Sequence, residues 1–314
     1  MKIISNYKNS YADIADINRE VENPATFIAK CEKIYYDQIG SIVNEILYSH
    51  GRYRIILLAG PSSSGKTTTA HKISEAFGTI GIHAPVVSID DFFLGIANYP
   101  KLPDGSPDME TIETVDIPLV NATFNELLEK GSAVFPIFDF TKSERSDKTR
   151  TIDLGKYGVL IVEGTHALNP RLTEFMDQRV LYRVYVSTRT KYSDGDKPLL
   201  TPKNSRLIRR MVRDHKFRGR LPIETLKSWN NILDGEEKHI YPYRDSVDFK
   251  IDSALDYEGC VFHHYILPLL EDMNSLEGDD LEKITQIKNA LEAFDDIDAS
   301  FIPKESLLRE FIGE

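Results

Sequence analysis

The sequence predicts an α/β fold: a doubly wound parallel sheet with helices on both faces. Four short apolar runs have the length of buried strands, at residues 54–59, 84–89, 157–162 and 181–186. The segments between them are long enough for the crossover helices that parallel strands require. With 314 residues, of which 41% are hydrophobic and 28% charged, the chain can bury a large core without disulfides.

Helices are expected on either side of these strands. Asn23-Pro24 is a helix start signal, because a capping side chain precedes a proline at the first helical position. An apolar stripe follows at three- and four-residue steps and ends near Gly51. It consists of Phe27, Cys31, Ile34, Tyr35, Ile39, Ile42, Val43 and Ile46. A final amphipathic helix begins near Asp279 and precedes an irregular tail at residues 307–314.

The composition argues against several function classes. Lys and Arg number 38 against 49 Asp and Glu, and this charge of −11 disfavours wholesale binding to nucleic acid or to an anionic membrane. Cys31 and Cys260 form no CxxC pair, so neither a thiol redox pair nor a cysteine zinc site is indicated. No apolar run approaches the roughly 18 residues of a membrane span. We therefore expect a soluble, cytoplasmic protein.

A phosphate-binding loop follows the first strand directly. Gly60-Pro-Ser-Ser-Ser-Gly65-Lys66-Thr67 stands between that strand and a helical pattern, the context in which such a loop cradles phosphates on backbone N–H groups. Lys66 is expected on the β- and γ-phosphates, and the Thr67 hydroxyl on Mg²⁺. The alternative is a chance glycine-rich turn with a surface lysine, and average residue usage gives this odds on the order of a per cent in a chain of this length. The predicted nucleotide-binding residues are Gly60, Pro61, Ser62, Ser63, Ser64, Gly65, Lys66, Thr67 and Thr68.

Acidic residues end two of the other predicted strands. Asp90 and Asp91 follow the second strand, where one carboxylate could deprotonate a phosphoryl acceptor. Glu163 ends the third strand, in the form of an acid that holds Mg²⁺ directly or through water. The alternative for each is an acid that only caps the next turn. The position beside the phosphate loop favours the functional interpretation.

A basic helix stands out in this acidic chain. Four of its arginines, at positions 206, 209, 210 and 213, fall on one helical face, opposite an apolar face that needs a partner surface. A lid that brings arginines over the nucleotide would neutralise charge and exclude water. A solvated face paired with distant acids and an RNA-binding patch are the alternatives. The basic residues are Arg206, Arg209, Arg210, Arg213, Lys216, Arg218 and Arg220.

In their order, these residues resemble the uridine kinase and phosphoribulokinase-like family of P-loop kinases. The resemblance runs from about residue 55 to residue 258 and rests on six motifs in register. They are the phosphate loop, Ser88-Ile-Asp90-Asp-Phe-Phe, Pro107-Asp-Met-Glu110 with Val115-Asp116, Phe135-Pro-Ile-Phe138-Asp139-Phe140 with Arg145, Val162-Glu163-Gly164 with Leu168-Asn169-Pro170, and Arg206-Leu-Ile-Arg-Arg210 with Arg213-Asp214 and Arg218-Gly219. The tail from Ser306 to Gly313 also resembles the end of a bacterial branch that often carries an N-terminal TGS domain, which this chain lacks.

The resemblance implies roles and boundaries. Asp90 would be the general base, with Lys66 and Arg209 as the other catalytic residues, and Thr67 and Glu163 would hold Mg²⁺. The acceptor-binding residues would be Glu110, Asp108, Phe138, Phe140, Arg145, Arg206 and Arg218. The chain would comprise a helical N-terminal extension (1–51), a P-loop kinase domain (52–270, with a lid at about 200–222) and a helical C-terminal extension (271–314).

This sequence departs from the family at the acceptor side. Pyrimidine kinases of the family have a tyrosine and a histidine that read the base where this chain has Phe138 and Ser143. Asn204 stands where the family has an aspartate before the lid arginine. A site without base-reading groups need not select a pyrimidine. Phosphoryl transfer is therefore better supported than any one acceptor.

Three hypotheses remain on the sequence alone. The first is an ATP- and Mg²⁺-dependent kinase acting on a hydroxyl of a nucleoside such as uridine or cytidine. The second changes the acceptor to another polyol or a sugar-like molecule. The third is a nucleotide-sensing regulatory or RNA-associated protein that transfers no phosphoryl group efficiently. The choice of ATP over GTP and a homo-oligomeric state are left open by the residues.

Overall fold

The centre of the fold is a five-stranded sheet in the order β10-β7-β2-β6-β3, seen in a computed structural model that describes residues 11–271, 273 and 276–314. The strands are β2 (Ile55–Ala59), β3 (Val86–Ser88), β6 (Leu160–Glu163), β7 (Leu181–Ser187) and β10 (Phe249–Asp252). Every pairing in this sheet is parallel. The predicted doubly wound parallel sheet is therefore confirmed, with β2 and its phosphate loop at the centre.

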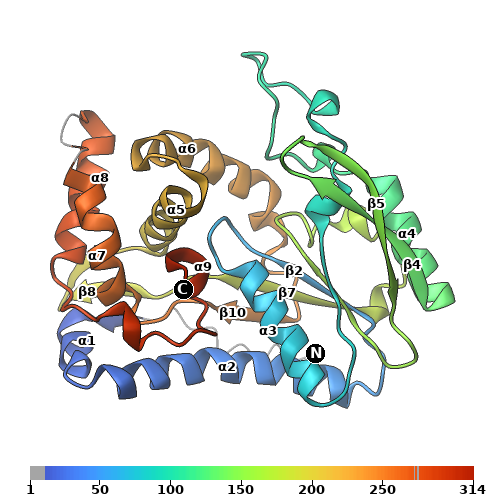
Figure 1. Ribbon diagram of the computed structural model, residues 1–314, viewed down its shortest axis with the longest axis horizontal. Helices are drawn as coiled ribbons and strands as arrows, with labels where there is room; N and C mark the ends of the chain where they lie inside the picture. The colour runs from blue at the N-terminus through green and yellow to red at the C-terminus, as the bar shows by residue number, and fades with distance from the viewer. Residues whose placement is uncertain (1–10, 272, 274–275) are drawn as a thin grey trace.

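Both faces of the sheet are covered. Along β2, Ile56 and Leu58 join one hydrophobic cluster, whereas Ile55 and Leu57 join the other. This alternation explains why the strand reads as a continuous apolar run. The first cluster takes in α3 (Lys66–Thr79), α5 (Pro202–Arg218), α6 (Pro222–His239) and α7 (Glu258–Glu271). The second takes in α4 (Ile117–Lys130) and the antiparallel hairpin of β4 (Ser132–Asp139) and β5 (Glu144–Asp153), at the right of Figure 1.

The helices outside the predicted kinase domain pack into the first cluster. Helix α2 (Pro24–Tyr48) begins where predicted, with the Asn23 side chain accepting from the N–H of Thr26. The apolar stripe is buried except for Ile34, which is 56% exposed. Helices α1 (Ile14–Val21), α8 (Gly278–Leu291) and α9 (Arg309–Ile312) contribute to the same cluster. The described parts of the two predicted extensions thus share a core with the domain between them (Figure 1).

Several strands were not predicted. The outer hairpin strand β5 has the sequence ERSDKTRTID, which is almost entirely polar because most of the strand lies at the surface. The edge strand β10 alternates apolar and charged residues and shows no continuous run. A small second sheet joins β1 (Tyr11–Asp13), β8 (Lys191–Asp194) and β9 (Lys197–Leu200). Strands that are covered on one side only lack the apolar signal on which the prediction rested.

Within the described residues, no helix is long and apolar enough to cross a membrane.

Candidate active site

The phosphate loop has the backbone of an anion cradle. Gly65 adopts a left-handed conformation with φ of 79° and caps α3, and Ser63 is left-handed as well, with φ of 57°. Gly60 has no room for a side chain, since a Cβ there would lie 2.2 Å from the carbonyl oxygen of Val186. The hydroxyls of Ser63 and Ser64 are buried and find no hydrogen-bond partner among the described residues. The cradle thus retains unused donors at a helix N-terminus.

Side chains behind the loop fix the direction of its peptide groups. The Ser62 carbonyl accepts from Arg206 at 3.0 Å, and the Ser64 carbonyl accepts from the Ser253 hydroxyl at 2.6 Å. In a trans peptide the N–H of the next residue points away from the carbonyl. The N–H groups of Ser63 and Gly65 therefore face away from Arg206 and Ser253, where they can donate hydrogen bonds to a phosphate oxygen.

Glu163 and Thr67 meet at the mouth of the loop. Strand β6 lies between β2 and β3, with Glu163 in register with Leu58 on one side and Ser88 on the other. The Thr67 hydroxyl donates to the Glu163 carboxylate at 3.2 Å, and Glu163 is only 6% exposed. A hydroxyl and a buried carboxylate are oxygen ligands of the kind that Mg²⁺ prefers. The two predicted metal ligands thus fit the ion in chemistry and in proximity.

The two neighbouring aspartates have different environments. The Asp91 carboxylate accepts from the N–H of Phe138 at 3.3 Å and from Arg150 at 3.1 Å, so it fastens the hairpin to the short 3₁₀ helix at Ile89–Phe92. The Asp90 carboxylate accepts no hydrogen bond from the described part of the chain. Burial, and next the charge of Glu163, raises the pKa of Asp90 to about 6. Asp90 is thus the member of the pair whose carboxyl is unpaired and has a raised pKa, and the general-base role that the resemblance implies for it stays a prediction.

The predicted acceptor acids lie near a buried histidine that the sequence analysis missed. Glu110 packs against Gly235 of α6, where an added Cβ would come within 2.8 Å of it. Burial raises the pKa of the Glu110 carboxyl, and Arg210 opposes that shift. Burial, followed by the nearby His239, lowers the pKa of His166 to about 4, and the Asp108 charge and a hydrogen bond with the Glu110 backbone oppose this shift. His166 stands three residues beyond Glu163. The expectation that functional side chains follow the carboxyl ends of parallel strands could therefore have identified it.

An aromatic cluster joins the hairpin to the end of the 3₁₀ helix at Ile89–Phe92. Phe138 contacts Phe93 and Phe140 edge-on, with ring centroids 5.6 and 5.1 Å apart. Phe138 is buried, whereas Phe140 is 64% exposed. Arg145 pairs with Asp116 at 3.0 Å, so its charge is already balanced and it ties the hairpin to the start of α4. The acceptor-binding role of these three side chains stays a prediction.

The prediction of a lid that includes Arg206 and Arg209 is wrong for this structure. The Arg206 guanidinium forms two hydrogen bonds to Glu236, at 2.6 and 2.8 Å, and is 3% exposed. Arg209 is fully buried, pairs with Glu258 and donates to the Ser253 carbonyl. Both side chains stand behind the loop and not over it. They position the loop, and the acids that neutralise them lie far along the chain.

A second group of arginines on α5 gathers around one buried carboxylate. Arg210, Arg213 and Arg218 all pair with Asp214, which is fully buried. The Arg210 guanidinium also donates to the Ser62 hydroxyl at 2.5 Å. Three guanidinium groups thus share this one carboxylate, and the charges of Glu110 and Glu310 act on Arg210 and Arg218 as well. The lid role predicted for Arg210, Arg213 and Arg218 stays a prediction.

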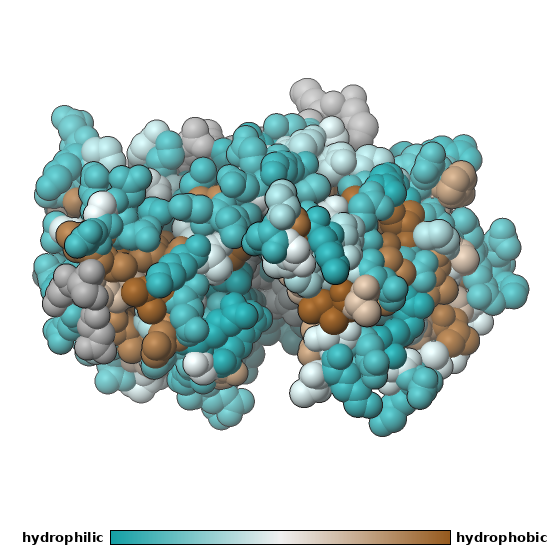
Figure 2. Space-filling model, turned by 90° about the horizontal axis from the view of Figure 1, so that it is seen from above, coloured by the Kyte–Doolittle hydropathy of each residue, from teal (hydrophilic) through white to brown (hydrophobic). Residues whose placement is uncertain are grey.

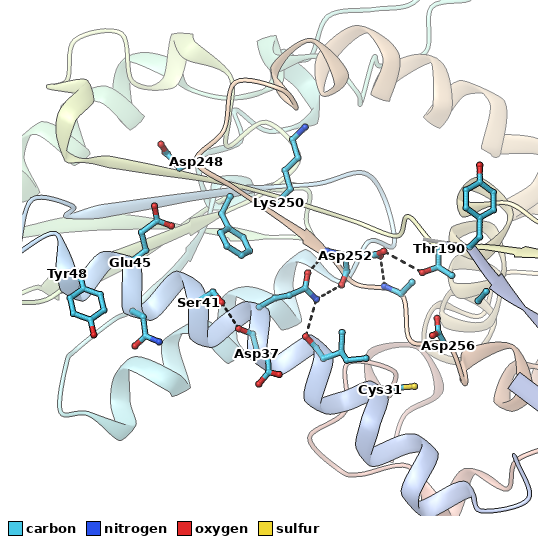
Figure 3. A pocket seen from close by; sticks show the side chains of 17 residues that line it. Cys31, Asp37, Ser41, Glu45, Tyr48, Thr190, Asp248, Lys250, Asp252 and Asp256 are labelled. Carbon is cyan, nitrogen blue, oxygen red and sulfur yellow. Dashed lines mark hydrogen bonds between the residues drawn. The ribbon is translucent and has the colours of Figure 1, made fainter. Parts of the chain in front are cut away.

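A cavity lies away from these residues. It encloses about 840 Å³ between α2 and β10, lined by side chains such as Asp37, Ser41 and Asp252 (Figure 3). A cavity of about 480 Å³ reaches Pro61 but includes neither Asp90 nor Glu163. Seen from above, the molecule is hollowed near its middle, between the half that carries α6 and α8 and the half that carries the hairpin (Figure 2). The chemistry-bearing residues are thus identified by their contacts and not by cavity size.

Comparison with known proteins assigns the chain to a family. The sequence profile of the "Phosphoribulokinase / Uridine kinase family" matches residues 55–257, from β2 to beyond β10. The chain belongs to the phosphoribulokinase / uridine kinase family. It is therefore a small-molecule kinase, as the resemblance implied.

Two relatives found by sequence agree with this membership, and one solved structure is similar in part. A uridine kinase of Lactobacillus helveticus is 33% identical over 169 residues, which cover 53% of this chain and 70% of the relative. A uridine kinase of Deinococcus deserti is 28% identical over 180 residues, covering 57% and 77% of the two chains. A solved structure described as a possible uridine kinase from Bacillus stearothermophilus is 24% identical, with a TM-score of 0.40, and the match covers 48% of this chain and 79% of that one.

Proposed function

We propose that this protein transfers the γ-phosphoryl group of ATP, in the presence of Mg²⁺, to a hydroxyl of a nucleoside such as uridine or cytidine. One observation carries the proposal. The unpaired Asp90 carboxyl, with its pKa raised to about 6, lies in the field of Glu163, which is hydrogen-bonded to Thr67 at the mouth of the phosphate loop. A proton acceptor and an oxygen ligand pair thus adjoin the phosphate cradle.

The loop residues bind and orient the donor. The N–H groups of Ser63 and Gly65 and the Lys66 ammonium would hold the phosphate oxygens. Thr67 and Glu163 would hold Mg²⁺, which when bound neutralises charge on the phosphates. Arg210 would add positive charge from the other side of Ser62. These groups favour the transition state because charge spreads over the transferring phosphoryl group.

Asp90 handles the proton. As the acceptor oxygen bonds to the γ-phosphorus, the bond from that phosphorus to the bridging oxygen breaks and ADP leaves. The hydroxyl proton passes to the Asp90 carboxylate, whose pKa of about 6 keeps it mostly ionised at neutral pH yet basic enough to accept. Asp108 and Glu110 would accept hydrogen bonds from the acceptor's other hydroxyls, and Phe138 and Phe140 would contact its ring.

A second acceptor class is favoured by one observation. Ser143, where pyrimidine kinases of the family have histidine, occupies a left-handed turn with φ of 55°, and its carbonyl accepts from the N–H of Ile96. Phe138 packs between two other rings and offers no polar atom. A hydroxyl-rich acceptor with an apolar face, such as a sugar or another polyol, would satisfy this combination without base recognition.

An acceptor panel tests the proposal. The purified full-length chain is incubated with Mg²⁺ and ATP, and ADP release is followed with pyrimidine nucleosides, purine nucleosides, sugars and polyols. Acceptor-dependent turnover with uridine or cytidine supports the first assignment, and turnover confined to a polyol supports the second. Tight nucleotide binding without turnover on any acceptor, together with salt-sensitive RNA retention, would replace both with a nucleotide-sensing role.

A further inference from the structure

The C-terminal segment of the chain lies directly on the phosphate loop. In Figure 1 the red end of the ribbon enters the middle of the molecule, beside α3 and α5. The Leu307 side chain packs against Gly65, where an added Cβ would lie 2.6 Å from its Cδ1 atom. Leu307, Leu308, Phe311 and Ile312 are all fully buried. The last residues are therefore a fixed part of the wall around the loop.

The same segment is anchored to α5 and to the loop after β10. The Arg209 guanidinium lies over the Phe311 ring, 5.1 Å from its centroid. The Lys216 ammonium donates to the Ile312 carbonyl. The Ser306 hydroxyl lies 2.9 Å from the Tyr257 hydroxyl. None of these contacts involves Glu310. They therefore hold the segment in place independently of Glu310, which lies between Ser306 and Phe311 in the sequence and contacts Thr68.

Glu310 accepts a hydrogen bond from a side chain at the start of α3. Its carboxylate accepts from the Thr68 hydroxyl at 2.5 Å. Thr68 is the third residue of α3, and the N–H groups of the first turn have no partner within the helix. A negative charge is favoured there by the helix dipole. The Glu310 carboxylate thus accepts from a hydroxyl in the segment that is predicted to bind the nucleotide.

We propose that Glu310 sets the affinity of the donor site by competing with the nucleotide for the Thr68 hydroxyl. This inference rests on the proposed function, namely that residues 60–68 bind a nucleotide. A hydroxyl donates its proton to one acceptor at a time, and two anions at one hydroxyl repel each other. Because Leu307 and Phe311 keep Glu310 close by, the competitor is present at a high effective concentration. Nucleotide binding therefore requires Glu310 to leave Thr68.

Nucleotide affinity of charge-removing variants tests this inference. Glu310→Gln keeps an oxygen that can accept from Thr68 but removes the charge, and Glu310→Ala removes both. Glu305→Gln is the matched control, because Glu305 is exposed in the same segment. We expect the dissociation constant for Mg²⁺-ATP, measured by calorimetry, to fall about tenfold in both Glu310 variants and to stay unchanged in the control. The gain should also appear with ADP and should disappear when Thr68→Val is added.

The affinity measurements have three informative outcomes. An unchanged or weakened affinity in Glu310→Gln, with wild-type secondary structure by circular dichroism, overturns the inference and leaves the proposed function standing. Binding in Glu310→Gln but not in the wild type supports the inference in its strongest form. No binding to any of these proteins overturns the proposed function, and the inference with it.

Discussion

The carboxyl end of β3 and the basic helix α5 both adjoin the phosphate loop, yet their charged residues are used differently. Asp90 at the end of β3 has a free carboxylate and a pKa raised to about 6. Arg206 and Arg209 on α5 are buried and neutralised by Glu236 and Glu258. The comparison teaches that a charged residue is available for chemistry only where no counter-charge from a distant part of the chain reaches it.

The largest effect is expected from Asp90→Asn. The variant cannot accept the acceptor's proton, so kcat should fall by about a thousandfold or more, while the dissociation constant for Mg²⁺-ATP stays within about threefold of wild type. Steady-state ADP release and calorimetry on one preparation measure both. Asp91→Asn is the matched control and should keep most of the turnover, because Asp91 only fastens the hairpin. If only Asp91→Asn lost turnover, Asp91 and not Asp90 would be the proton acceptor.

Arg209→Met tests the other half of the comparison. The change leaves Glu258 buried without its partner, so the free energy of unfolding should fall by about 3–5 kcal/mol. Urea denaturation measures the loss. The paired variant with Arg209→Met and Glu258→Met should recover most of it, because no unpaired charge remains. A single variant with wild-type stability and abolished turnover would instead make Arg209 a catalytic residue.

The raised pKa of Asp90 makes stability depend on pH. The folded state binds this proton more tightly than the unfolded state, so stability is fully present below the ordinary pKa of 3.8 and is lost as pH rises through about 6. Asp90→Asn has no ionisable carboxyl at this position, so its stability does not fall in this way as the pH rises. The variant should be more stable than wild type by about 2 kcal/mol at neutral pH, allowing for residual solvation, and the difference should shrink towards pH 4. Urea midpoints that differ equally at both pH values would argue against the raised pKa.

A smaller effect is expected from Arg210→Ala. Arg210 donates to the Ser62 hydroxyl of the phosphate loop, and Asp214 retains two other arginines. The Michaelis constant for ATP should rise about tenfold, with unfolding free energy changed by less than about 1 kcal/mol. Initial rates over a range of ATP concentrations provide the measurement. Equal losses of stability in Arg209→Met and Arg210→Ala would erase the distinction between buried and available arginines.

The sheet and one side of the site could be predicted because the signals are local. A strand covered on both faces is a continuous apolar run, and in a parallel sheet the residues that follow such runs meet at one edge. Lys66, Thr67, Asp90 and Glu163 follow this rule, and the structure brings them together.

The rest could not be predicted, because it depends on residues distant in sequence. Glu236 and Glu258 neutralise arginines 30 and 49 residues away, and Glu310 reaches Thr68 across 242 residues. No periodicity records such a pairing. The hairpin strand β5 was missed for a different reason, since a largely solvated strand needs few apolar residues.

The central claim is that the phosphate loop and Asp90 form one site. It is tested most directly by the carboxyl ¹³C signal of Asp90 in aspartate-labelled protein, titrated with and without a saturating, non-hydrolysed Mg²⁺-ATP analogue. We expect the midpoint near pH 6 to move by more than about half a unit on binding, because the bound charges would lie close by, while the signal of the distant Asp248 does not respond. An Asp90 titration that is the same in both states would contradict the claim.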